Sequence, residues 1–210
     1  MKPELPELKN QLMGIVDQKL LYPIPRELFS TNASHVRQNT LLRRAAVSVL
    51  FCGDRFLDSK VLLTERSLTL PTHSGQVAFP GGMLEPADQG DSAQAALREC
   101  EEEVGVSKSL VQVLGVLPSF PTLTGDFDVV PVIGMLQRRE LPPFHLSDEV
   151  TVAEWVSVSA LIQSKFWEER TVSQIQLKTP CFMWGERKMW GLSAWIFDLI
   201  LKRYDTIFSI

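Results

Sequence analysis

With 210 residues, 45% of them hydrophobic and 22% charged, the chain is long enough to bury one sizeable core and fits a single domain with additions. A formal net charge of -4 offers no basic surface to a nucleic-acid backbone, which argues against a nucleic-acid partner but not against a small anionic ligand. No run reaches the roughly 18 apolar residues that a membrane span needs, and acids stand where a secretory signal would be apolar. Three widely spaced cysteines without a CxxC motif are expected to be reduced. We therefore predict a cytoplasmic protein with no membrane partner.

Hydrophobic periodicity predicts strands interleaved with a few helices. A helical period over 5–21 predicts an N-terminal helix, and β-branched apolar runs at 44–52 and 60–65 predict two paired core strands. Residues 76–79 predict a short strand, which should end in a sharp turn at 80–82. Beyond a helix that begins near residue 92, the expected elements are strands near 110–117, 127–136 and 151–157, a short helix near 158–164, a hairpin turning at Gly185 and a last helix over 191–203.

This order of elements indicates an α+β fold, an α/β/α sandwich in which helices flank a mixed central sheet. We assign residues 1–38 to an N-terminal helical extension and residues 39–210 to the main domain. The N-terminal helix is expected to pack either on its own domain or on a partner chain, so a homodimer is left open.

The helix after residue 91 carries the clearest chemical signal. Asp91 or Ser92 begins it as an N-cap, and Gly105 ends it. One stripe of this helix is apolar and is expected to face the core: Ala93, Ala96, Leu97, Cys100 and Val104.

Three acids of the same helix share another face, because Glu99, Glu102 and Glu103 stand at i, i+3 and i+4. Like charges at that spacing repel one another unless a cation compensates, and Mg²⁺ prefers such oxygen ligands. Arg98, four residues before Glu102, is placed to hold that carboxylate through a bidentate contact. Although an isolated acidic triplet is usually a solvated helix face, this one follows a strand, a glycine pair and an acidic loop. Together these features favour a metal site.

Residues 82–106 resemble the Nudix box, GX5EX7REUXEEXGU, where U is an apolar residue. The second half matches in register at Arg98, Glu99, Cys100, Glu102, Glu103, Gly105 and Val106. In the first half Asp88 stands where the family has glutamate, and the loop is longer by two residues. The loop acid is therefore left open among Glu85, Asp88 and Asp91.

The resemblance implies a Nudix hydrolase with a Nudix-type fold over 39–210, in which divalent metals, Mg²⁺ or Mn²⁺, contact a substrate pyrophosphate and a water attacks one phosphorus. It implies that the metal ligands are Glu99, Glu102, Glu103 and, more weakly, the Gly81 carbonyl. Such enzymes often draw a further glutamate from a loop before a later strand, and we choose Glu149 over Asp148 as this general base. The implied catalytic residues are Glu149, Glu102 and Arg98.

Residues 62–82 resemble the signature of coenzyme A pyrophosphatases, LLTxR(S/A)xxxRxxxGxxxFPGG, with Pro71 in place of the second arginine. The matching positions are Leu62, Leu63, Thr64, Arg66, Ser67, Gly75, Phe79, Pro80, Gly81 and Gly82. The resemblance implies hydrolysis of coenzyme A or acyl-CoA to 4'-phosphopantetheine, or its acyl form, and adenosine 3',5'-bisphosphate. The implied substrate contacts are Arg66, Ser67, His73 and Phe79.

Two other functions stay open at this point. Another Nudix activity, on ADP-ribose or a nucleoside-diphosphate sugar, is supported by Pro71, because proline cannot replace an arginine that binds phosphate. A Nudix-fold binding module without turnover predicts loss of box carboxylates, and none is lost between Arg98 and Glu103. The partner expected in either enzymatic case is a small nucleotide.

Overall fold

The computed structural model describes residues 7–17, 42–122, 127–137, 141–172 and 175–208. In chain order the elements are α1 (Glu7–Asp17), β1 (Arg43–Cys52), β2 (Lys60–Arg66), β3 (Val77–Ala78), β4 (Gly81–Met83), the 3-10 helix η1 (Pro86–Asp88), α3 (Ser92–Val104), η2 (Lys108–Leu110), β5 (Val111–Val116), β6 (Phe120–Pro121), β7 (Phe127–Leu136), β8 (Val150–Ser157), α4 (Val158–Gln163), β9 (Phe166–Val172), β10 (Ile175–Trp184), β11 (Arg187–Met189) and α5 (Gly191–Phe208).

Eight strands form a mixed sheet in which β1 and β7 run parallel and the other pairs are antiparallel. The main path is β3-β2-β1-β7-β5, with β8 on the outer side of β2. The first two strands pair at Phe51–Val61 and Cys52–Lys60 and then separate. In the resulting split, β3 pairs with β2, and β4 pairs with β1. The chain from Val77 to Met83 therefore crosses from one strand to the other.

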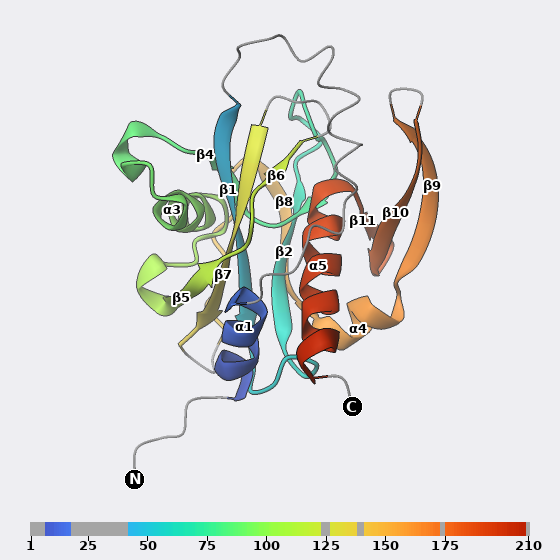
Figure 1. Cartoon of the computed structure of the whole chain (residues 1–210). Helices are drawn as coiled ribbons and strands as arrows, with labels where there is room; N and C mark the ends of the chain where they lie inside the picture. The colour runs from blue at the N-terminus through green and yellow to red at the C-terminus, as the bar shows by residue number, and fades with distance from the viewer. Residues whose placement is uncertain (1–6, 18–41, 123–126, 138–140, 173–174, 209–210) are drawn as a thin grey trace.

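Helices cover both faces of this sheet, as Figure 1 shows: α3 lies on one side, and α1 and α5 lie on the other, next to the hairpin of β9 and β10. Side chains alternate along β1, so Val49 and Phe51 join the apolar cluster under α5, whereas Leu50 and Cys52 join the cluster under α3. The predicted α+β sandwich with a mixed sheet is confirmed. Cys52, Cys100 and Cys181 are buried and free, as predicted.

The N-terminal helix α1 packs on its own chain. Leu8, Leu12 and Ile15 are fully buried against the cluster that contains α5. The buried Arg203 of α5 donates from Nη1 to the Ile15 carbonyl at 2.8 Å. The predicted helix is confirmed over Glu7–Asp17, and residues 5–6 and 18–21 of the prediction lie outside the described ranges.

One predicted turn is wrong. Residues 81–83 form β4, which lies beside Ala45, Ala46 and Val47 of β1. Only glycine permits this approach at Gly81, because a Cβ there would lie 2.3 Å from the Ala46 carbonyl oxygen. The periodicity also gave no sign of the edge strand β9, whose middle is charged, and it ended α5 at 203 rather than at Phe208.

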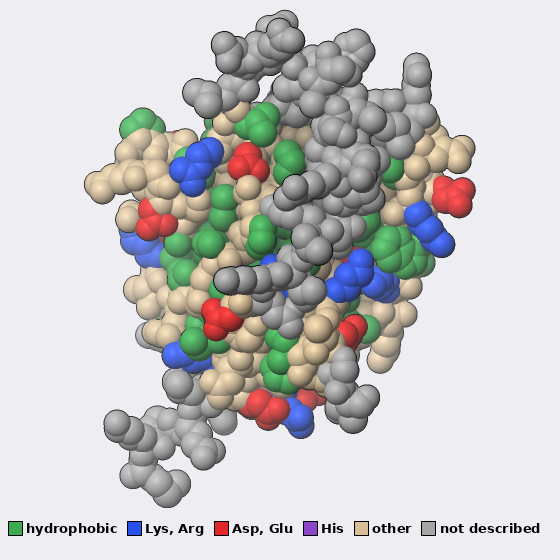
Figure 2. Space-filling view, in the orientation of Figure 1, with side chains coloured by type: hydrophobic (Ala, Val, Ile, Leu, Met, Phe, Trp, Pro, Cys, Tyr) green, Lys and Arg blue, Asp and Glu red, His purple; other side chains and the backbone are tan. Residues whose placement is uncertain are grey.

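Charged side chains of both signs lie scattered over the described part of the face shown in Figure 2, without a basic band. Among the described residues, no helix combines the length and the apolar character that crossing a membrane requires.

Candidate active site

The helix α3 is fixed closely to the strand β1. The Ser48 hydroxyl donates to the Ala96 carbonyl at 2.6 Å, and small residues at Ala46, Ala95 and Ala96 let the two backbones approach. Asp91 is the N-cap, and its carboxylate accepts from the Ala93 amide at 2.8 Å. Neither the spacing nor the type of Ser48 signals this contact in the sequence, because a serine in a strand is unremarkable.

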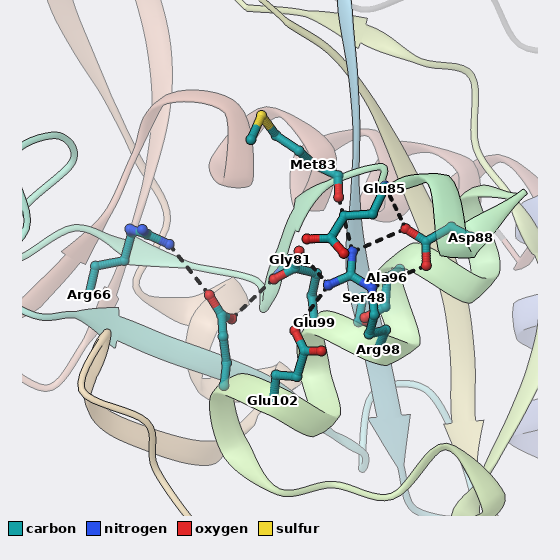
Figure 3. A network of polar contacts seen from close by, with 11 residues as sticks. Ser48, Arg66, Gly81, Met83, Glu85, Asp88, Ala96, Arg98, Glu99 and Glu102 are labelled. Atoms are coloured by element: carbon teal, nitrogen blue, oxygen red, sulfur yellow. Dashed lines mark hydrogen bonds and ion pairs between the residues drawn. The ribbon is translucent and has the colours of Figure 1, made fainter. Parts of the chain in front are cut away.

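Arg98 is the centre of a first polar cluster, made of Met83, Asp88, Glu99 and Glu102 (Figure 3). Its Nε and Nη2 atoms donate to the two oxygens of Asp88 at 3.1 and 3.0 Å, and Nη2 also donates to the Met83 carbonyl at 3.1 Å. Its Nη1 atom lies 3.0 Å from both Glu99 Oε1 and Glu102 Oε2. The bidentate contact expected with Glu102 is therefore made with Asp88 instead, and Glu102 receives a single bond.

The three loop acids have separate positions. Asp88 is buried, and the Arg98 guanidinium holds the pKa of its carboxyl below its usual range. It also accepts from the Glu85 amide at 2.8 Å, because the two form a capping box at η1. Asp91 is the N-cap of α3, and Asp88 is the loop acid that forms an ion pair with Arg98.

Glu103 belongs to a second polar cluster, with Arg66, Gly81 and Glu149. Its side chain is 7% exposed; it accepts from the Gly81 amide at 3.2 Å, and its Oε1 lies 3.5 Å from Arg66 Nη1. The other terminal nitrogen of Arg66 lies 3.5 Å from Glu149 Oε2. Burial raises the pKa of Glu103 to about 7. The helix acids are thus divided between two arginines.

Glu99 lies against the bare backbone of β4. A Cβ at Gly82 would lie 2.4 Å from the carboxyl carbon of Glu99, so any side chain at this position would displace the carboxylate. Burial raises the pKa of Glu99, and the adjacent Arg98 acts in the opposite direction.

Glu149 reaches this site because its loop caps the C-terminus of α3. Gly105 ends the helix with a left-handed φ of 75°, and the last carbonyls of a helix need outside donors. The amides of His145 and Ser147 supply them, donating to the carbonyls of Val104 and Glu103 at 3.0 Å each. The sequence marks the helix end at Gly105 but does not show which loop caps it.

Comparison with known proteins identifies the family to which this chain belongs. The NUDIX domain pattern matches residues 42–175, and the chain is 37% identical to NudL, an uncharacterized Nudix hydrolase of Escherichia coli, over 163 residues. That match covers 77% of this chain and 83% of the relative. The chain belongs to the Nudix family.

Solved structures of the Nudix family share the fold at low sequence identity. A MutT/nudix family protein of Enterococcus faecalis has a TM-score of 0.55 at 18% identity, covering 86% of this chain and 69% of that chain. A MutT protein of Methanosarcina mazei has a TM-score of 0.53 at 17% identity, covering 82% of this chain and 99% of that chain. This Nudix chain is a hydrolase that acts on pyrophosphate bonds, and the family generally uses divalent metal ions.

The carboxylates of the Nudix site are of the chemical type that binds such a cation, but their present geometry is not that of a metal site. Among the side chains that the structure describes, no three acidic, histidine or cysteine groups stand together as a metal cluster. Arginine nitrogens lie between the carboxylates instead, at Arg98 and Arg66. Carboxylate oxygens such as those of the partly buried Glu99 and the buried Glu103 are the hard donors that Mg²⁺ or Mn²⁺ prefers.

The residues predicted to contact substrate lie in different surroundings, and only Arg66 and Ser67 contact residues of the second polar cluster. Arg66 faces Glu103 and Glu149, and Ser67 follows it, donating from its amide to the Glu149 carbonyl at 2.8 Å. His73 is exposed at a positive φ of 57°, with its Nδ1 3.0 Å from Gln76 Oε1. Phe79 is 3% exposed and packs in the cluster under α5, so its ring faces the core.

The raised pKa of Glu103 predicts a pH-dependent stability in the metal-free protein. From its ordinary value of 4.5 up to about 7, the folded state holds the proton more tightly than the unfolded state, so stability falls as pH rises through this window. A shift of that size corresponds to about 3 kcal/mol of folding free energy at most.

Glu103→Gln removes the titration but keeps an acceptor for the Gly81 amide. Urea unfolding with a chelator, at about pH 5 and pH 8, should show the variant gaining stability relative to wild type at the higher pH. A difference that is the same at both pH values would contradict the assignment.

Proposed function

We propose that this hydrolase cleaves the pyrophosphate of coenzyme A or acyl-CoA, giving 4'-phosphopantetheine, or its acyl form, and adenosine 3',5'-bisphosphate. The observation that carries the proposal is the contact of Arg66 with both Glu103 and Glu149 at 3.5 Å. Arg66 belongs to residues 62–82, which resemble the coenzyme A pyrophosphatase signature. Through Arg66, this segment contacts two of the glutamates proposed for pyrophosphate hydrolysis. The buried, free cysteines support the cytoplasmic location predicted for such an enzyme.

The residues proposed to hold Mg²⁺ or Mn²⁺ are Glu99, Glu102, Glu103 and the Gly81 carbonyl. A bound divalent cation neutralises charge on phosphoryl oxygens and increases the acidity of nearby water. Asp88 and Arg98 position two of these ligands, because the guanidinium that Asp88 fixes bonds to both Glu99 and Glu102.

Glu149 is the proposed general base. Its side chain is 57% exposed, so water can reach it, and the neighbouring Arg66 holds it beside the buried Glu103. A carboxylate in that position can take the proton of a water that attacks phosphorus. The Arg66 guanidinium, which contacts these carboxylates, is then placed to stabilise the negative charge that develops on the phosphoryl oxygens of the substrate.

The experiment that tests the proposal is hydrolysis of a substrate panel with Mg²⁺ or Mn²⁺, with products separated by chromatography. The panel contains coenzyme A, an acyl-CoA, ADP-ribose, UDP-glucose and a dinucleoside polyphosphate. We expect coenzyme A or its acyl derivative to give the highest kcat/KM. A preference for ADP-ribose of about a hundredfold, roughly 3 kcal/mol in transition-state binding, would overturn the substrate assignment.

The second candidate function, hydrolysis of ADP-ribose or a nucleoside-diphosphate sugar, is favoured by one observation. Pro71 lies exposed in the loop that follows Arg66, where the signature has its second arginine. If no other residue supplies that cation, a substrate without a third phosphate is preferred.

A further inference from the structure

Arg43 is an exposed arginine at the start of β1, on the opposite face of the sheet from the carboxylate helix. Side chains alternate along this strand: its neighbour Arg44 reaches the α3 face and donates to Ser92 Oγ at 3.1 Å. Arg43 instead lies over the ring of Phe127, with its guanidinium carbon 5.1 Å from the ring centroid. Phe127 stands directly opposite it on β7.

Within the described ranges, no carboxylate pairs with Arg43. Among the described residues, its guanidinium contacts only the Met83 sulfur and the Phe127 ring, and Met83 is itself 42% exposed. The other arginines near the site are engaged: Arg44 by Gly90 and Ser92, Arg66 by two glutamates and Arg98 by three acids. A guanidinium with free N–H groups and no described acid beside it is a binding group for phosphate.

The strand β4 links Arg43 to the catalytic clusters. Gly81 at one end donates to Glu103, and Met83 at the other end contacts Arg43 through its side chain and Arg98 through its carbonyl. Two residues of strand span on the order of 7 Å. The intervening backbone at Gly81 and Gly82 carries no side chains, and β4 lies in the split between β1 and β2. The Glu99 carboxylate lies against Gly82, so only this short strand separates a ligand bound at the carboxylates from Arg43.

We propose that Arg43, which lies over the Phe127 ring, binds a phosphate monoester of the substrate that is distinct from the scissile pyrophosphate, namely the 3'-phosphate of coenzyme A. This inference rests on the proposed function and gives it a specificity-determining residue. It also accounts for Pro71: the second fixed cation is supplied from β1, so the loop after Arg66 does not need one.

The test compares coenzyme A with 3'-dephospho-coenzyme A, which keeps the pyrophosphate but lacks the monoester. Arg43→Gln should raise KM for coenzyme A about tenfold or more with little change in kcat, because a charge-assisted contact is lost. The same variant should leave kcat/KM for the dephospho substrate within about twofold of wild type. Arg43→Lys should recover part of the loss, and Phe127→Leu should cause an intermediate one. Equal effects of Arg43→Gln on both substrates, or no effect on either, would overturn the inference.

Arg55→Gln is the matched control. This substitution removes the same charge as Arg43→Gln. Arg55 lies in the turn after β1, at the other end of that strand, and pairs with Glu7. The Arg55→Gln variant should leave kcat/KM for both substrates unchanged.

A second measurement separates this inference from the proposed function: calorimetric binding of adenosine 3',5'-bisphosphate and of adenosine 5'-monophosphate needs no turnover. The bisphosphate should bind wild type about tenfold more tightly, and Arg43→Gln should abolish that difference. If wild type hydrolyses neither coenzyme, the proposed function fails, whereas equal binding of the two nucleotides overturns the Arg43 site.

Discussion

Replacing Glu103 with glutamine should lower kcat by about a thousandfold or more at saturating Mg²⁺, and should weaken Mn²⁺ binding in the absence of substrate. The physical reason is that Glu103 is the most buried of the three helix acids, and a buried ligand charge acts at low dielectric. The loss of several kcal/mol of charge stabilisation corresponds to that factor in rate. Steady-state kinetics and calorimetric titration with Mn²⁺ measure the two effects.

Glu101→Gln provides the control for this variant, because it neutralises another acid of the same helix, two residues away. Glu101 belongs to neither polar cluster, so its replacement should leave kcat and Mn²⁺ affinity near wild type. Full activity of Glu103→Gln would contradict the ligand assignment. An equal loss in both variants would mean that the acids of this helix act only through their total charge.

Asp88→Asn should destabilise the protein by about 3 kcal/mol and lower kcat/KM by about a hundredfold. The buried carboxylate accepts two bonds from Arg98, and an amide cannot reproduce that bidentate pair, so the partly buried guanidinium is left undercompensated. Activity falls because Arg98 then no longer holds Glu99 and Glu102, and loss of such supporting contacts typically costs 10- to 100-fold. Thermal or urea unfolding and Mg²⁺-dependent kinetics report the two losses separately.

Asp91→Ala distinguishes this positioning role from a general weakening of the helix. Asp91 caps the same helix, so its loss should cost about 1 kcal/mol of stability while activity is retained under conditions where the protein stays folded. An Asp88→Asn variant that behaved like Asp91→Ala, with reduced stability but normal turnover, would exclude Asp88 from the organisation of the site.

Local signals in the sequence were sufficient for the carboxylate helix. The N-cap at Asp91, the stop at Gly105 and the acid spacing are all encoded within a few residues, and the structure places each of the two caps as expected. The buried strands β2 and β7 followed from their apolar runs in the same way. Patterns of this kind depend on neighbours along the chain, which a sequence displays directly.

The division of the acids between two arginines was not predictable from spacing. A helical wheel puts Glu99, Glu102 and Glu103 on one face, but it does not show that Arg66 comes from another strand to take Glu103. The choice of Asp88 among three loop acids likewise depends on a fold in which η1 turns its side chain towards Arg98. Both outcomes arise from tertiary contacts between segments that are distant in sequence or separated by a loop.

The split between β1 and β2 has a consequence for how such a protein can change over evolution. Because β4 fills the split, the groups for bond cleavage stand on one face of the sheet, while Arg43, Phe127 and the Met83 side chain stand on the other. The carboxylate helix packs on the first face, against Ala46, Ser48 and Leu50, so substitutions on the second face remove none of these contacts. Specificity can thus diversify independently of the reaction itself, and one inherited chemistry becomes available to many nucleotides.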